Sequence, residues 1–199
     1  DWLDASFNVI KKYNIAGKNI EQLETEIISD FKDIGLGKDG FTKKLKYKIP
    51  EYPFKEEKAQ VFGKQALDKW IYFRNMANEA VFRFLKHLLM TDEIRIWPHH
   101  FDTGVYKDID GKIGLGFGLA MQDSLVDSPY FYLSGYLLTG QLSFENLPSL
   151  KFGRWDTGDW NGAVLPLSEI DDLSDEEKRT AVDEFIKSTL DWYWKSSVK

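Results

Sequence analysis

The chain has 199 residues, a formal net charge of −6 and no cysteine. This length fits one domain with a single core, and the lack of cysteine excludes disulfides, thiolate nucleophiles and cysteine-ligated zinc. The acidic balance argues against nucleic acids and anionic membranes as partners, since neither polyanion is attracted by the net field.

The first third of the chain is predicted to be largely helical. One helix is expected from Trp2 to Tyr13 and a second from Ile20 to Ile34, with Asn19 as its N-cap and Gly35 at its end. Charged and apolar residues alternate from Lys44 to Ile49, and this pattern predicts a half-buried edge strand.

Two longer helices are predicted further along the chain. The first runs from Lys64 to Met90, and its apolar stripe comprises Leu67, Trp70, Ile71, Ala77, Val81, Leu85 and Leu88. The segment from Ser174 to Glu177 has the spacing of a capping box and begins a C-terminal helix over about 174–197. Between the two helices, at about 93–170, short apolar runs punctuated by Gly, Pro and Asp predict strands.

We therefore predict an α+β fold over 1–199. An antiparallel sheet in the C-terminal half packs against the long central helix, the N-terminal helices (within about 1–92) and the C-terminal helix. No internal repeat marks a boundary, so a single domain is expected. The first residue is Asp1 rather than Met, which is compatible with a piece of a longer chain.

The loop between the strands Phe101–Lys107 and Lys112–Ala120 decides which side chains share a face. A two-residue turn at Asp110 and Gly111 would leave apolar residues beside bare glycines. A three-residue loop, in which Asp108 pairs with Lys112, gathers the apolar side chains on one face. We predict the second register, with an apolar face made of Phe101, Thr103, Val105, Ile113, Leu115, Phe117 and Leu119.

The opposite face of this hairpin would carry His100, Asp102 and Tyr106 above glycines 104, 114, 116 and 118. If 129–136 is a strand of the same sheet, it adds Tyr130 and Tyr132 to that face. Two interpretations stay open. The glycine floor with its polar rim could form a small-molecule pocket, or the glycines could let a helix pack closely on the sheet.

His99, His100 and Asp102 form the one cluster with metal-ligand chemistry. Strand alternation brings His100 and Asp102 together and directs His99 to the other face, and a third ligand would have to come from Asp156, Asp159 or Glu79. We therefore predict no metal and instead a hydrogen-bonded His100–Asp102 pair. This pair could also supply a general base, but no nucleophile motif of the type Gly-x-Ser-x-Gly accompanies it.

A polar, glycine-rich loop around 155–162 carries Trp155 and Trp160. Tryptophans beside carboxylates and amides can stack on sugars, and they can equally fold back to cover a core. Both interpretations stay open.

Three segments together resemble a known family: Trp97-Pro98-His99-His100-Phe101-Asp102, Pro129–Tyr132 and Trp160–Glu169. They are similar to a bacterial domain-of-unknown-function family whose members carry a Trp-Pro-His-His-Phe-Asp strand. The resemblance spans roughly Gln22 to Ile170, and the hexapeptide is its most specific part. It implies an architecture but no activity. Members of that family carry a further β-rich region ahead of this one, so the likeness also implies that part of the sheet or pocket lies outside this chain.

The leading interpretation is a bacterial, cytoplasmic domain that binds a small polar or sugar-like ligand without a cofactor. The candidate ligand-binding residues are His100, Asp102, Tyr106, Tyr130, Tyr132, Trp155 and Trp160. One alternative is a metal-assisted hydrolase that uses His100 and Asp102, and another is a structural or partner-binding domain, including a homodimer. The sequence contains no run of about 18 apolar residues, so no membrane-spanning helix is predicted. The residues do not decide whether the protein is an enzyme.

Overall fold

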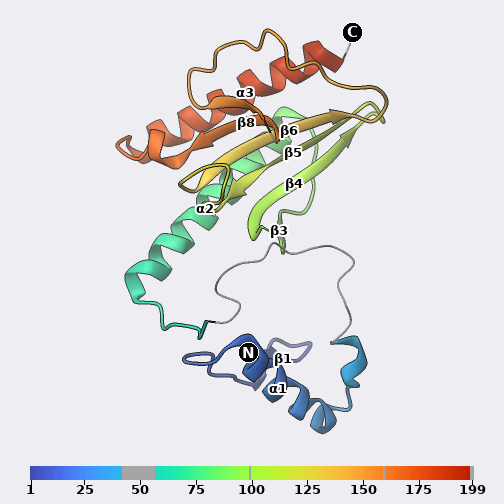
Figure 1. Ribbon diagram of the computed structural model, residues 1–199, viewed down its shortest axis with the longest axis vertical. Helices are drawn as coiled ribbons and strands as arrows, with labels where there is room; N and C mark the ends of the chain where they lie inside the picture. The colour runs from blue at the N-terminus through green and yellow to red at the C-terminus, as the bar shows by residue number, and fades with distance from the viewer. Residues whose placement is uncertain (42–56, 99, 159, 198–199) are drawn as a thin grey trace. The chain divides into compact units, whose positions relative to one another are not determined.

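The computed structural model describes residues 1–41, 57–98, 100–158 and 160–197 (Figure 1). Internal contacts divide the chain into two compact units, Asp1–Asp68 and Lys69–Lys199, and each is described by itself. The predicted strand Lys44–Ile49 lies outside the described residues, and the single domain over 1–199 stays a prediction. In the described part of the chain, no helix has the length and apolar character needed to cross a membrane.

The first unit begins with a small antiparallel hairpin, in which β1 (Trp2–Leu3) pairs with β2 (Val9–Lys11). The predicted helix from Trp2 to Tyr13 is therefore wrong. Asp4 accepts hydrogen bonds from two backbone N–H groups just after it, at 2.8 and 2.9 Å, and so stabilises a turn. Phe7 has a φ of 63°, which no right-handed helix can contain.

The second predicted helix is confirmed as α1 (Ile20–Asp30), which continues into a short 3₁₀ helix, Phe31–Ile34. The Asn19 side chain accepts a hydrogen bond from the Gln22 backbone N–H at 2.9 Å, and the Gln22 side chain accepts one from the Asn19 backbone N–H at 3.1 Å. Gly35 ends the segment with a φ of 73°, as expected of a left-handed C-cap. A further 3₁₀ turn follows at residues 38–40.

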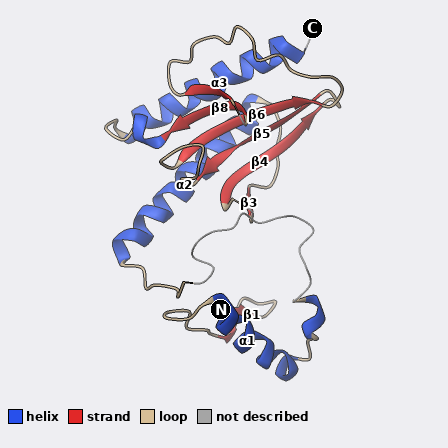
Figure 2. Cartoon of the chain, viewed as in Figure 1, coloured by secondary structure: helices blue, strands red, loops and turns tan. Residues whose placement is uncertain are grey.

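The second unit contains a six-stranded antiparallel sheet, which confirms the predicted α+β class (Figure 2). The strand order is β3-β4-β5-β6-β8-β7. The bounds are β3 Arg95–Trp97, β4 Asp102–Ile109, β5 Ile113–Ala120, β6 Tyr130–Leu137, β7 Arg154–Thr157 and β8 Asn161–Pro166.

The two long helices are α2 (Lys64–His87) and α3 (Asp175–Ser197). The capping box before α3 is confirmed, because the Ser174 backbone donates to Glu177 at 2.9 Å and Ser174 Oγ accepts from the Glu177 N–H. Helix α2 ends three residues earlier than predicted, since Leu89 has a φ of 55°.

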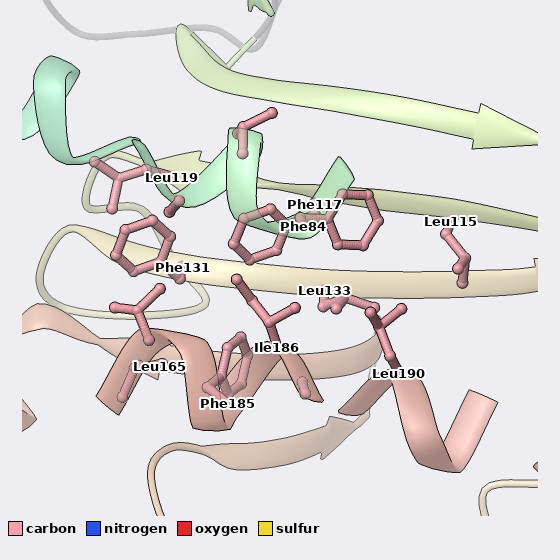
Figure 3. Packing of buried hydrophobic residues seen from close by; sticks show 14 of the residues in the cluster. Phe84, Leu115, Phe117, Leu119, Phe131, Leu133, Leu165, Phe185, Ile186 and Leu190 are labelled. Carbon is pink, nitrogen blue, oxygen red and sulfur yellow. The ribbon is translucent and has the colours of Figure 1, made fainter. Parts of the chain in front are cut away.

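Both helices pack on the same face of the sheet. Figure 3 shows Phe84 from α2 and Phe185, Ile186 and Leu190 from α3 gathered against the side chains of the strands. Phe84 stacks on Phe117 of β5 with 5.0 Å between ring centroids. The strand residues buried here are Val105, Ile109, Ile113, Leu115, Phe117, Leu119, Phe131, Leu133, Ala163 and Leu165.

The apolar stripe of α2 differs from the predicted one at its first turns. Trp70 and Ile71 are exposed, at 41% and 50%. Arg74 is buried instead, and its guanidinium lies against the Trp70 ring at 4.9 Å. The stripe follows the expected spacing only from Ala77 on.

In the β4–β5 hairpin, side chains are distributed between the two faces as predicted, but the paired residues differ from the predicted ones. Ile109 pairs with Ile113, and Asp108 pairs with Gly114 rather than with Lys112. Asp110 and Gly111 both adopt positive φ, and Asp108 Oδ1 accepts the Gly111 N–H at 3.0 Å. The loop still has three residues, so the apolar side chains share a face as predicted.

Candidate functional site

Neither α2 nor α3 covers the glycine face of the sheet, and aromatic side chains lie over most of its glycines. A Cβ atom at Gly104 or Gly118 would lie within 3.0 Å of the Tyr132 hydroxyl. One at Gly114 would meet Tyr106, and one at Gly162 would meet the Trp160 ring. The glycines therefore provide room for rings from the same sheet.

A cavity of about 460 Å³ opens on this face. Its lining combines carboxylates, hydroxyls and aromatic rings from β4, β6, the β5–β6 loop and the segment before β8. The lining residues are His100, Asp102, Ala120, Asp123, Ser124, Leu125, Tyr130, Tyr132, Ser134 and Trp160. The structure therefore brings together five of the seven predicted ligand-binding residues.

Asp102 is the buried carboxylate of the cavity, with 6% of its surface exposed. It accepts a hydrogen bond from the Tyr132 hydroxyl through Oδ2. Burial, followed by the charge of Asp102 and this hydrogen bond, raises the pKa of Tyr132 well above its ordinary value of 10.0. Tyr132 is therefore a neutral donor to a carboxylate at physiological pH.

Asp123 and Tyr130 form a second carboxylate–tyrosine pair, which the residue patterns do not indicate. The Tyr130 hydroxyl donates to Asp123 Oδ2 at 2.9 Å. Asp123 Oδ1 accepts backbone N–H groups of Leu125 and Val126, which fixes the loop as an Asx turn. Burial, then Asp123, raises the pKa of Tyr130, so this hydroxyl also stays neutral. The signal for this turn in the sequence is the pair Asp123-Ser124, which follows β5.

Arg74 supports the cavity from the other face of the sheet. Its guanidinium donates to Thr103 Oγ1 and to the Phe101 carbonyl oxygen, the latter at 2.8 Å. The Phe101 ring lies against the same guanidinium at 5.2 Å. Burial lowers the pKa of Arg74, and the nearby charge of Asp102 opposes that shift. Arg74 thus holds the residues on either side of Asp102, through the Phe101 backbone and the Thr103 side chain.

The entry to β4 differs from the predicted extended strand. Phe101 has a φ of 56° and is 54% exposed, so it lies before the strand and outside the apolar face. The strand begins at Asp102. His100 still lines the cavity with Asp102, although a turn rather than strand alternation places it there. The predicted orientation of His99 lies outside the described residues.

The other two predicted ligand-binding residues lie away from the cavity. Tyr106 stacks on Tyr136 with 5.7 Å between ring centroids, further along the same face. Trp155 is paired with Ala163 in the sheet and packs against Trp192 of α3 at 4.7 Å, on the helix-covered face. Its indole N–H donates to the Pro148 carbonyl at 2.8 Å. This is the core-covering arrangement that the sequence left open.

Of the residues considered as further metal ligands, Glu79 and Asp156 do not form a group of three with His100 and Asp102. Glu79 lies on α2 and pairs with Arg179 at 3.0 Å. Asp159 falls outside the described residues. Over residues 1–41, 57–98, 100–158 and 160–197, no three His, Asp or Glu side chains are grouped to hold a metal ion. Asp156 is close enough to Tyr130 for its charge to raise that pKa.

Removal of the Tyr132 hydroxyl, as Tyr132→Phe, is expected to destabilise the unit Lys69–Lys199 by about 1–3 kcal/mol, because buried Asp102 loses a donor. The control is Tyr72→Phe, whose hydroxyl donates to Asp175 at a more exposed site, at 2.9 Å. It should cost less than about 0.5 kcal/mol. Urea unfolding curves of the two variants measure the difference, and equal losses would contradict the role given to Tyr132.

The same variant should change the response to alkaline pH. A tyrosine whose folded pKa is raised stabilises the fold fully below pH 10, and that contribution is lost as the pH rises further. Tyr132→Phe lacks this contribution, so its free energy of unfolding should fall less steeply above pH 10 than that of the wild type. A parallel decline in both proteins would argue against a raised pKa at Tyr132.

The second unit is thus an antiparallel sheet with helices on one face and a carboxylate–aromatic cavity on the other. No family model, curated protein or solved structure matches the chain.

Proposed function

We propose that the chain binds a small polar organic molecule, of about the size of a sugar ring, in the cavity on the glycine face. The cavity is the observation that carries this proposal. Its volume of about 460 Å³ falls within the range of roughly 300–1,000 Å³ that is typical of small-molecule sites. It lies on the sheet face that α2 and α3 leave uncovered.

The lining suits a ligand with both polar groups and a flat or compact apolar surface. Trp160, Tyr130 and Tyr132 contribute aromatic side chains to the lining, and the half-buried Trp160 and Tyr132 are more exposed than Tyr130. Asp102, Asp123 and Ser134 offer oxygen acceptors beside those rings. Few, well-placed polar groups among apolar surface are what fix the orientation of a small ligand.

Ligand-observed NMR with a panel of monosaccharides, polyols, amino acids and small amines tests the proposal. We expect binding by the wild type and a loss of affinity of about tenfold or more in Trp160→Ala, since a central aromatic contact is removed. Tyr106→Ala is the matched control, because it removes a ring from the same face outside the cavity lining. A panel without any binder, or equal binding by Trp160→Ala, would overturn the proposal.

A further inference from the structure

We propose that the ligand of this cavity is an organic cation, and specifically a methylated ammonium group. This inference rests on the proposed function and narrows its class of ligand. It follows from three properties of the lining: the sign of its charges, the hydrogen bonds its carboxylates already accept, and its aromatic rings.

The charges around the cavity are predominantly negative. Asp102 and Asp123 line it, and neither Lys nor Arg is among the ten lining residues. The charge of Asp156 also reaches Tyr130. Arg74 offsets part of the charge of Asp102 from the opposite face. Asp123 accepts its hydrogen bonds from Tyr130 and two neighbouring backbone groups, all of them neutral donors. Asp123 is also exposed, so it is the carboxylate that a cation in the cavity can reach directly without competing with a cationic partner of these contacts.

The hydrogen bonds within the lining favour a ligand that needs few partners. The Tyr132 and Tyr130 hydroxyls both donate to carboxylates, so these donors are already used. The lining also contains the Ser124 and Ser134 hydroxyls and the Trp160 indole N–H as donors, which are few for a neutral sugar with its several hydroxyls. A methylated ammonium has no or few N–H groups, and it interacts through charge and surface contact instead.

The aromatic residues supply the remaining contact. Tyr130, Tyr132 and Trp160 line one cavity, and a cation over the face of such rings is attracted by their quadrupole. Both tyrosines stay neutral because burial and the neighbouring aspartates raise their pKa values, so they line the cavity as neutral phenol rings. A bare metal ion fits less well, since it needs several oxygen ligands at about 2.0–2.6 Å and the described residues offer no such group.

Calorimetric titration of the full chain with choline and with its neutral isostere 3,3-dimethyl-1-butanol separates charge from shape. Choline should bind about tenfold more tightly than the isostere, and added salt should weaken only choline binding. Asp123→Asn should reduce choline affinity about tenfold while leaving the isostere unchanged. The control is Asp127→Asn, which alters the net charge equally on the same loop but lies outside the lining.

The possible outcomes distinguish this inference from the proposed function. If the isostere or a neutral sugar binds as tightly as choline, the cation is excluded and the cavity remains a binding site. If Asp123→Asn and Asp127→Asn weaken choline binding equally, the binding depends on general surface charge and the inference is overturned. If neither choline nor the isostere nor any compound of the panel binds, both proposals fail.

Discussion

Phe84→Ala is expected to lower the free energy of unfolding of the unit Lys69–Lys199 by about 3–5 kcal/mol, the usual cost of emptying a buried phenylalanine site. Phe84 has no exposed surface and stacks on Phe117 at 5.0 Å. Phe117 in turn stacks on Phe131 at 5.8 Å. The cavity left by the substitution would open at the α2 end of this row, between α2 and the sheet, where the surrounding side chains can relax little.

Phe82→Ala is the control for this prediction, because it removes the same ring from the same helix at a site with 63% exposure. It should change stability by less than about 0.5 kcal/mol. Urea unfolding, monitored through the hydrogen-exchange protection of the β5 amides, reports on this unit separately from Asp1–Asp68. Similar losses of unfolding free energy in the two variants would show that the row of stacked rings does not stabilise the core.

Much of the fold could be predicted from residue patterns in the second unit. The parity of the hairpin follows from the alternation of apolar residues with glycines in β5, because only an odd loop gathers Phe117 and Val105 on one face. The capping box at Ser174 likewise identifies the start of α3 by local chemistry alone. The hairpin at Trp2–Lys11 was missed because its turn depends on Asp4 and on the positive φ of Phe7, which helical periodicity does not reveal.

The candidate site was predicted in part, for a definite physical reason. Alternation along β6 placed Tyr130 and Tyr132 on the same side as Asp102, and these residues do line one cavity. Alternation cannot tell how far along a face a ring lies, so Tyr106 was included although it stacks on Tyr136.

The place of Arg74 depends on contacts that are distant in sequence, and the place of Asp123 depends on loop geometry. Residue patterns reveal neither. A charged residue on an apolar helical stripe is normally assigned to the solvent side. Arg74 is instead buried, because Thr103 and Phe101, 27 to 29 residues away, accept its hydrogen bonds. Asp123 reaches the cavity only because its loop folds back over β6.

Gly118→Ala tests whether the glycine floor is required for both fold and site. A Cβ at this position would lie 2.6 Å from the Thr103 carbonyl oxygen and 2.8 Å from the Tyr132 hydroxyl. The first clash is with backbone of the neighbouring strand, so it cannot be relieved by a side-chain rotation. We expect a loss of about 3 kcal/mol, at the upper end of the usual cost of overpacking.

Gly116→Ala is the matched control on the same strand and the same face. There a Cβ would meet only Ser134 Oγ, at 3.3 Å, and that hydroxyl can rotate away. Because alanine also restricts the unfolded chain more than glycine does, this variant should be neutral or more stable by up to about 1 kcal/mol. Thermal unfolding of both variants gives the comparison, and equal stabilities would refute the close approach at Gly118.

Ligand binding should separate the same two variants, for a reason that connects the floor to the site. At Gly118 the added methyl group displaces the Tyr132 hydroxyl, and with it the hydrogen bond to Asp102. Any ligand held beside these residues should then bind at least about tenfold more weakly, even at a temperature where Gly118→Ala remains folded. The bare glycines of β5 would therefore serve the cavity by letting an aromatic ring reach a buried carboxylate, which an ordinary strand residue would prevent.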